Sequence, residues 1–344
     1  MKSVSLVLLL ARGIYAGPDS SCTQLGPQIR SVMTLLDQSR TSEAQALLSD
    51  ASEASLPCPD RLLALARLRA AENKFDESGK LFTQFLETGP TNPEGPFYFG
   101  AMLLRIGYYP QAETLADRAL TLNPSHVGAL TLKGRLLLMR GQAAESQHTL
   151  ERAIALDPKY AEAHFQLGTL FDRRKQHESA LREFEAVTAL TASDARAYDY
   201  MALNWEQLGD TIRAAKAFQR GLACNSGPLS DSFLDFNYGR FLLKQDRLQE
   251  SREYLNRAVT VAPKVRAVLY ERAKLLLRMG NFKDAVQDAV RALDTPDPGH
   301  VILDSQLYSL LAVSFSRLGS VEEADKFTRL AAETGIPPRS ADRK

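Results

Sequence analysis

A spacing of 34 residues recurs along this chain and limits the folds that it can adopt. Two sets of small residues follow it, each member 34 residues after the one before: Gly100, Gly134 and Gly168, and Ala112, Ser146 and Ala180. A period of about 20–50 residues indicates a solenoid or another repeat array. Small side chains at two fixed points let the backbones of two helices approach closely, because no bulky group stands between them.

Residues 161–194 form the clearest copy of the repeat. Counted from Ala161, this copy has Gly168 at position 8, Phe171 at position 11, Ala180 at position 20 and Phe184 at position 24. Small residues at 8 and 20 with bulky residues at 11 and 24 resemble the tetratricopeptide repeat. The resemblance implies an all-α fold, a right-handed superhelical solenoid of about nine repeats. Each repeat would be a helix, a turn and an antiparallel helix, stabilised by stacking on its neighbours.

The register extends from this copy in both directions, with two interruptions. Three residues, 229–231, are extra before the seventh repeat, and five residues, 300–304, are extra before the ninth. Residues 339–344 are expected to form a C-terminal tail. The predicted array covers 25–338, as repeats 25–58, 59–92, 93–126, 127–160, 161–194, 195–228, 232–265, 266–299 and 305–338.

Position 15 of the repeat, where the first helix should end, provides an independent check of this register. Five of its nine residues are glycine and two more are Asn or Asp. These residue types tolerate the left-handed backbone conformation that commonly ends a helix. The nine residues are Ser39, Asn73, Gly107, Gly141, Lys175, Gly209, Asp246, Gly280 and Gly319.

The N-terminus resembles a secretory signal peptide. Lys2 precedes an apolar run over 4–11, and the small residue Ala16 stands at a possible cleavage site. We expect residues 1–16 to be a signal peptide and the protein to be exported, either to the periplasm or out of the cell. A cytoplasmic location is the alternative. The apolar run is too short to span a bilayer, so we expect no transmembrane segment in the mature chain.

Two cysteines lie at the ends of the first expected helical hairpin. Cys22 precedes the first expected helix and Cys58 follows the second. The two ends of an antiparallel hairpin lie side by side. If the chain is exported, we predict a Cys22–Cys58 disulfide. Two unrelated free thiols are the alternative.

The sequence lacks the common motifs of catalysis and of metal or cofactor binding. It contains no phosphate-binding loop, no Gly-x-Gly-x-x-Gly, no Cys-x-x-Cys and no His-Glu-x-x-His. We therefore expect no enzymatic activity, no metal and no cofactor; an enzyme with an unrecognised site in the groove is a lesser alternative. Lys and Arg number 42 against 41 Asp and Glu, a balance that argues against a nucleic-acid partner.

The resemblance implies a scaffold or adaptor that binds segments of partner proteins in a concave groove lined by the first helices. Positions 2, 5, 9, 12 and 13 of each repeat would point into this groove. Across the nine repeats, positions 9 and 13 carry nine cations and one acid. A helix dipole favours cations near the C-terminus, at position 13, but it does not explain the cations at position 9. The excess therefore suggests a binding surface.

Repeats seven and eight each place an aromatic residue four positions before a cation. Residues four apart share a helix face, so Phe236 lies beside Arg240, and Tyr270 beside Lys274. We expect a protein or peptide partner that is acidic and partly apolar; an ordinary solvated groove is the alternative. A structural accessory subunit of an envelope or export complex is the alternative function. The predicted partner-binding residues are Phe233, Phe236, Arg240, Lys244, Tyr270, Lys274 and Arg278.

Overall fold

The structure is a computed structural model. It describes the backbone over 20–49, 58–226 and 230–334, and side chains over 27–48, 58–226 and 230–334. The expected signal peptide, 1–16, and the expected tail, 339–344, lie outside these residues. The described part of the chain is all-α, as predicted. None of its helices is both long and apolar enough to cross a bilayer.

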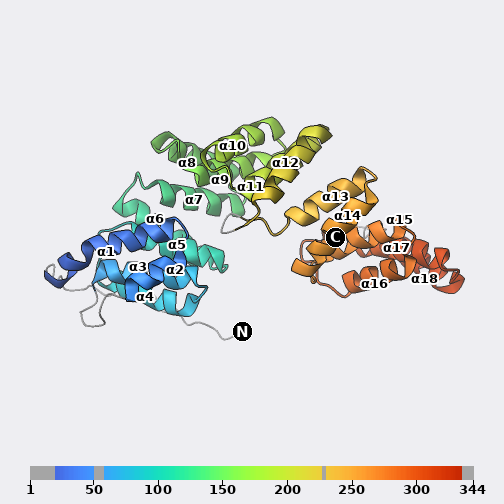
Figure 1. The fold of residues 1–344 in the computed structure, drawn as a ribbon, viewed down its shortest axis with the longest axis horizontal. Coiled ribbons are helices and arrows are strands. Elements are labelled where there is room, and N and C mark those ends of the chain that lie inside the picture. Colours follow the sequence, from blue (N-terminus) through green and yellow to red (C-terminus); the bar gives the residue numbers. More distant parts are fainter. Residues whose placement is uncertain (1–19, 50–57, 227–229, 335–344) are drawn as a thin grey trace, which may run out of the picture. The chain divides into compact units, whose positions relative to one another are not determined.

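The chain divides into two compact units, residues 1–190 and 191–344 (Figure 1). The described residues of the first unit form ten helices: α1 (Ser20–Asp37), α2 (Thr41–Ser49), α3 (Pro59–Ala71), α4 (Phe75–Glu87), α5 (Glu94–Arg105), α6 (Tyr109–Leu122), α7 (Val127–Met139), α8 (Ala143–Leu156), α9 (Ala161–Arg173) and α10 (His177–Leu190). Those of the second unit form eight: α11 (Ala195–Gln207), α12 (Thr211–Cys224), α13 (Leu234–Lys244), α14 (Leu248–Val261), α15 (Arg266–Arg278), α16 (Phe282–Leu293), α17 (Asp304–Arg317) and α18 (Val321–Thr334).

Helices pair in the order of the chain, α1 with α2, α3 with α4, and so on to α17 with α18. Within each unit, the first helix of a pair also packs against the first helix of the next pair, as α3 does against α5 and α13 against α15. We call the surface that the odd-numbered helices of a unit form its first-helix face. Side chains on this face from neighbouring repeats can therefore contact one another.

The residues at position 15 adopt the expected backbone conformation. All nine have positive φ, from 57° at Lys175 to 88° at Gly107. Each follows closely on the end of an odd-numbered helix, where the chain turns toward its partner helix. The prediction for this position is confirmed, including at Ser39 and Lys175, whose residue types rarely adopt positive φ.

Lys175 is the position at which a glycine should help most. A left-handed conformation costs a residue with a Cβ roughly 1–2 kcal/mol, which the greater freedom of glycine in the unfolded chain partly offsets. We expect Lys175→Gly to raise the unfolding free energy by about 0.5–1 kcal/mol in urea denaturation. Arg174→Gly is the matched control, because Arg174 has φ −85° and should lose stability. A less stable Lys175→Gly protein would contradict the expectation.

Glycine at position 8 makes room for the bulky residue at position 24. A Cβ on Gly168 would lie 2.8 Å from the ring of Phe184, and one on Gly134 would lie 2.6 Å from Leu150. Phe184 and Leu150 are fully buried. The close approach of the two helices of a repeat, expected from the small residues, is therefore confirmed at both sites.

Serine at position 20 adds a hydrogen bond to this close approach. The hydroxyl of Ser146 donates to the carbonyl oxygen of Gly134 at 2.7 Å, and that of Ser78 donates to Ala66 at 2.7 Å. Both serines are fully buried. A buried hydroxyl without a partner costs free energy, so this bond explains how serine replaces alanine there.

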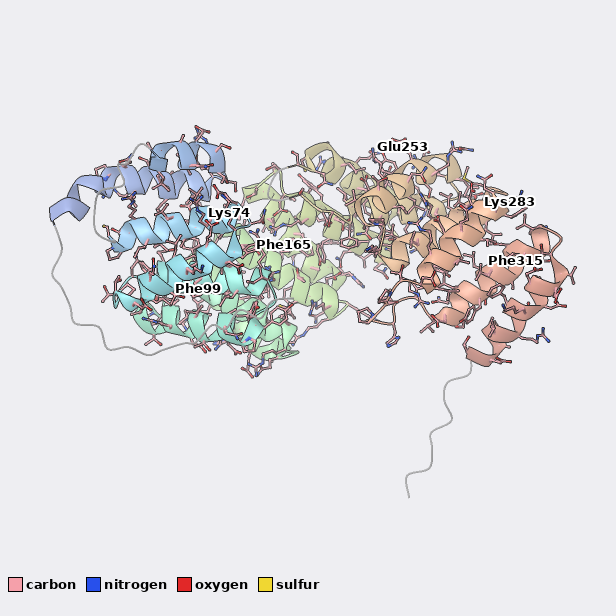
Figure 2. The ribbon with its side chains drawn as sticks, turned by 90° about the horizontal axis from the view of Figure 1, so that it is seen from below. Lys74, Phe99, Phe165, Glu253, Lys283 and Phe315 are labelled. Carbon is pink, nitrogen blue, oxygen red and sulfur yellow. The ribbon has the colours of Figure 1, made fainter. Side chains whose placement is uncertain are left out.

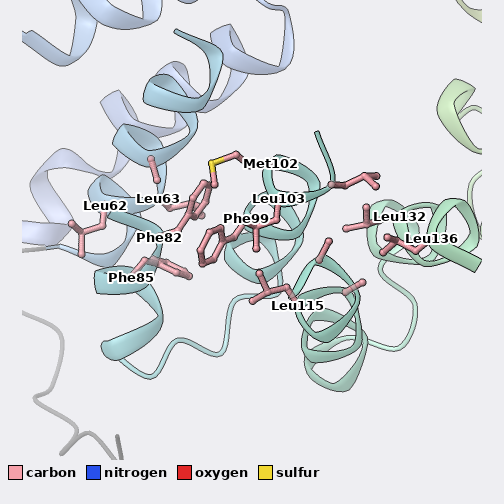
Figure 3. Close-up of a cluster of buried hydrophobic side chains, with 14 residues drawn as sticks. Leu62, Leu63, Phe82, Phe85, Phe99, Met102, Leu103, Leu115, Leu132 and Leu136 are labelled. Atoms are coloured by element: carbon pink, nitrogen blue, oxygen red, sulfur yellow. The ribbon is translucent and has the colours of Figure 1, made fainter. Parts of the chain in front are cut away.

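Buried aromatic side chains join successive repeats in the first unit. The rings of Phe82 and Phe99 stack with centroids 5.0 Å apart and planes at 8°. Both belong to a buried cluster that continues through Met102 to Leu132 (Figure 3). Figure 2 labels Phe99 and Phe165 in this unit and Phe315 in the second. Stacking of neighbouring repeats therefore supplies the core, as expected for an array of short helices.

Candidate partner-binding site

The seven residues predicted to bind a partner lie on two neighbouring helices of the second unit. Phe233 is the N-cap residue of α13, three more residues are on α13 itself, and the remaining three are on α15. α13 and α15 pack against each other, so the seven share one region of the first-helix face. Each is at least partly exposed. We call this set of residues the α13–α15 patch.

The turn before α13 is held by hydrogen bonds. The side chain of Asn225 accepts from the backbone N–H of Asp231 at 2.7 Å and donates to its carbonyl oxygen at 2.9 Å. The carboxylate of Asp231 then accepts from the backbone N–H of Phe233 at 2.7 Å. Asp231 is one of the extra residues before the seventh repeat, and it positions the first aromatic side chain of the patch.

The aromatic residues and the cations lie beside one another as the four-residue spacing predicts. The guanidinium carbon of Arg240 is 6.0 Å from the ring centroid of Phe236, and Nζ of Lys274 is 5.2 Å from that of Tyr270. The ring of Phe233 meets Phe236 edge to face, with centroids 6.5 Å apart. Phe233 is 44% exposed.

Glu206 of α11 offsets two of the cations on α13. Its carboxylate lies 2.6 Å from Nζ of Lys244 and 3.7 Å from Nη2 of Arg240. The side chain of Glu206 is only 9% exposed, whereas that of Lys244 is 53% exposed. The acid is therefore fixed beneath the cations and attracts them toward the protein surface.

Two further carboxylates offset the cations on α15. Glu271 lies 2.8 Å from Nζ of Lys274, and Asp246 lies 2.6 Å from Nη2 of Arg278. Four cations of the patch thus face three carboxylates, counting Glu206. These acids stand at positions 6, 12 and 15 of the repeat, outside the positions that showed the cationic excess. The patch is therefore much closer to electrical balance than that excess indicated.

A buried carboxyl group, that of Asp199 on α11, lies next to the patch. Its Oδ2 accepts from the side-chain amide of Asn237 at 2.7 Å, and its Oδ1 has no hydrogen-bond partner in the unprotonated form. Burial and then the charge of Asp231 raise the pKa of Asp199 to about 8, although Asn237 and Arg240 act in the opposite direction. Asp199 therefore keeps its proton at neutral pH. The protonated carboxyl group can donate a hydrogen bond to Asp231.

One feature of the sequence marks Asp199 as unusual. Asp199 stands at position 5, where the neighbouring repeats have Phe165 and Phe236. Burial also raises the pKa of Asp231. Asn237 on α13, next to Phe236, holds this buried acid through its hydrogen bond.

The patch combines aromatic side chains with charged groups. It offers partly exposed aromatic faces and charged groups that can exchange an internal ion pair for one with a ligand. Among the residues that the structure describes, no group of three or more His, Cys, Asp and Glu side chains is arranged to hold a metal ion.

Two family models match the repeats of this chain, and both are described as tetratricopeptide repeat. One matches residues 137–203, and the other matches 30–93, 103–146 and 239–301. Together these segments cover more than half of the 344 residues. The chain belongs to the tetratricopeptide repeat family. Proteins of this family generally serve as scaffolds for protein interactions.

Solved tetratricopeptide repeat structures share the fold. A chain in the crystal structure of the APC/C hetero-tetramer Cut9–Hcn1 is similar with a TM-score of 0.65 and 15% identity, over 87% of this chain and 57% of that chain. PilF of Pseudomonas aeruginosa is similar with a TM-score of 0.53 and 15% identity, over 69% of this chain and 97% of that chain. At these identities the likeness concerns the fold alone. No curated protein sequence matches this chain.

The predicted disulfide concerns the first tetratricopeptide repeat. α1 begins at Ser20, so Cys22 lies in its first turn and not before the helix as expected. Cys58 is the N-cap residue of α3, is buried and is free in the structure. The side chain of Cys22 lies outside the described side chains, so the Cys22–Cys58 disulfide stays a prediction.

Proposed function

We propose that this protein is a non-catalytic adaptor that binds a segment of a partner protein on the α13–α15 patch. The family supports this role in general terms, and the exposure of Phe233 beside Phe236 is the observation that supports the site. An exposed aromatic side chain next to a half-buried one offers apolar area that a ligand can cover, and aromatic residues dominate the energetics of protein interfaces.

The ion pairs within the patch limit how acidic its partner segment can be. Glu206, Glu271 and Asp246 already pair with the cations, so a strongly acidic ligand would have to displace them. A partner segment with an apolar anchor for Phe233 and Phe236 suits the patch best. One or two acidic residues in that segment would then pair with Lys244 and Arg278, the most exposed cations of the patch.

Site-specific photo-crosslinking tests this proposal in the native source. p-Benzoylphenylalanine in place of Phe233 or Lys274 should capture one partner, which mass spectrometry identifies. The same group in place of Ile212 on α12 or Val261 on α14, which are 82% and 60% exposed, should not capture it. These control positions are more exposed than Phe233, so accessibility alone would favour them. Equal capture at all four positions would contradict the proposal.

The captured partner then allows a quantitative check with purified proteins. Phe233→Ala is expected to weaken binding about tenfold, the loss typical of an interface anchor, with an unchanged melting temperature because Phe233 is exposed. Ile212→Ala should bind normally. Phe233 is preferred to Arg240, because Arg240 also lies 3.7 Å from Glu206 and lowers the pKa of the buried Asp199, so that removing it would disturb groups within the protein. Normal binding by Phe233→Ala would exclude the patch.

A further inference from the structure

The first unit has a cavity of its own on the first-helix face, between α1, α3 and α5. Its volume is about 270 Å³. The buried side chains of Phe82 and Met102 form part of its lining, and Ala70, Ala71 and Ala101 form much of the rest. Figure 3 shows Phe82 and Met102 near each other in the buried cluster. The lining of the cavity is therefore largely apolar.

Small residues at three groove positions create this cavity. Ala70 and Ala71 stand at positions 12 and 13, where the next repeat carries Leu104 and Arg105. Ala101 stands at position 9, where the repeat before carries an arginine. Three alanines on two adjacent first helices thus remove the long side chains that would otherwise fill the space between those helices.

One arginine at this cavity, Arg67, forms an ion pair within the protein. Nη2 of Arg67 lies 2.6 Å from Oδ1 of Asp37, and the guanidinium carbon lies 3.7 Å from the ring centroid of Tyr98. The hydroxyl of Tyr98 donates to the same oxygen of Asp37 at 3.2 Å. Arg67 is only 9% exposed. These three side chains hold one another in place, and Arg67 and Tyr98 form one polar wall of the cavity.

The second arginine, Arg105, forms no ion pair with the described residues. It is exposed, donates to the side-chain carbonyl of Asn73 and lies 4.8 Å from the ring centroid of Phe75. Both partners are uncharged, and no carboxylate of the described residues lies within ion-pair distance of it. An apolar cavity thus has at its edge a cation whose charge is available to a ligand.

We propose that this cavity binds a peptide segment of a partner protein in which a bulky apolar side chain stands next to an Asp or Glu. The apolar side chain fills the space beside Phe82, Met102 and the three alanines, and the carboxylate pairs with Arg105. The volume is small for a drug-sized molecule and suits one inserted side chain. The site goes beyond the proposed function, because it lies in the other unit and binds independently of the α13–α15 patch.

Methionine methyl signals can report binding at this cavity directly. The chain has six methionines; Met102 lines the cavity, whereas Met139, at the end of α7 in the same unit, does not. The full chain, labelled with ¹³C at the methionine methyl groups, is titrated with the peptide Gly-Ser-Phe-Asp-Ser-Gly and with its leucine counterpart. At least one peptide should shift the Met102 signal and leave that of Met139 unchanged. No shift at Met102 at millimolar peptide would overturn the proposal.

Two substitutions separate the apolar part of the site from the charged part. Replacing Asp in the peptide with Asn should weaken binding up to about fivefold, and Arg105→Gln in the protein should remove that difference. Ala101→Leu should abolish the Met102 shift by filling the cavity. If Ala101→Leu does not fold, Ala71→Leu at an exposed position of α3 serves instead. Peptide binding that survives a filled cavity would also overturn the proposal.

The two sites can fail separately. The peptide titration uses purified protein and reads the first unit, whereas photo-crosslinking at Phe233 reads the second unit in the native source. Crosslinking at Phe233 without any Met102 shift would exclude only the cavity. A Met102 shift without crosslinking at Phe233 would exclude only the α13–α15 patch.

Discussion

Phe184→Ala should lower the unfolding free energy of the first unit by about 3–5 kcal/mol, the usual cost of deleting a fully buried phenylalanine. Phe184 is 0% exposed. Its ring meets that of Phe165 edge to face, with centroids 5.7 Å apart. The ring also lies against Gly168, which has no side chain that could move into the space. The cavity left by the substitution should therefore stay open, which places the loss at the high end of the range.

Urea denaturation followed by far-UV circular dichroism measures this loss. Repeat arrays need not unfold in a single step, so hydrogen exchange of peptides from α9 and α10 should be measured as well. Leu190→Ala is the matched control, because Leu190 ends the same helix and is 40% exposed. It should cost less than about 1 kcal/mol. A near-neutral Phe184→Ala protein would show that position 24 does not pack against position 8.

Asp199→Asn is expected to make the second unit more stable at pH 9 and to change it little at pH 4. In the unfolded chain Asp199 loses its proton near its ordinary pKa of 3.8, whereas in the folded chain it keeps the proton up to about pH 8. The wild-type unfolding free energy therefore falls as the pH rises from about 4 to about 8, and it stays low above pH 8. Asparagine cannot ionise, so the variant lacks this fall, which is on the order of a few kcal/mol.

Asparagine also fits the hydrogen bonds of the protonated acid. Its carbonyl oxygen can accept from Asn237, and its amide can donate to Asp231, the two groups that face Asp199 together with Arg240. Urea midpoints at pH 4, 7 and 9 measure the effect. Asp246→Asn is the matched control, because its side chain is 75% exposed and asparagine tolerates positive φ. If Asp199→Asn follows the same pH profile as the wild type, the buried acid is not protonated in the folded state.

Much of the fold could be predicted because the repeat pattern is local. Position 15 turns the chain within a few residues of a helix end, so residue type reports the conformation there even when one copy, such as Lys175, departs from the pattern. Gly168 and Phe184 belong to the same repeat and pack against each other. Both features depend on residues close in sequence. The same pattern recurs in nine copies of the 34-residue repeat, so each copy supports the others.

The candidate site was predictable only in part, for a related reason. Phe236 and Arg240 are four residues apart on one helix, so their contact follows from helix geometry. Glu206 reaches Arg240 from a different helix, and no spacing within a repeat reveals that contact. The division of the chain after residue 190 was likewise not predicted.

The amino-acid sequence was sufficient to establish the helices, their pairing and the family, because each repeat folds against its nearest neighbours by the same few small and bulky residues. The ion pairing and the protonation of the charged groups depend on how different helices pack together. Glu206 offsets the cations on α13, Asp199 keeps its proton, and Arg105 remains available at the edge of the first unit's cavity. Electrostatic energy depends on the distance between side chains and on how far water is excluded from them. Neither quantity is present in a linear pattern, and both arise once neighbouring first helices stand side by side.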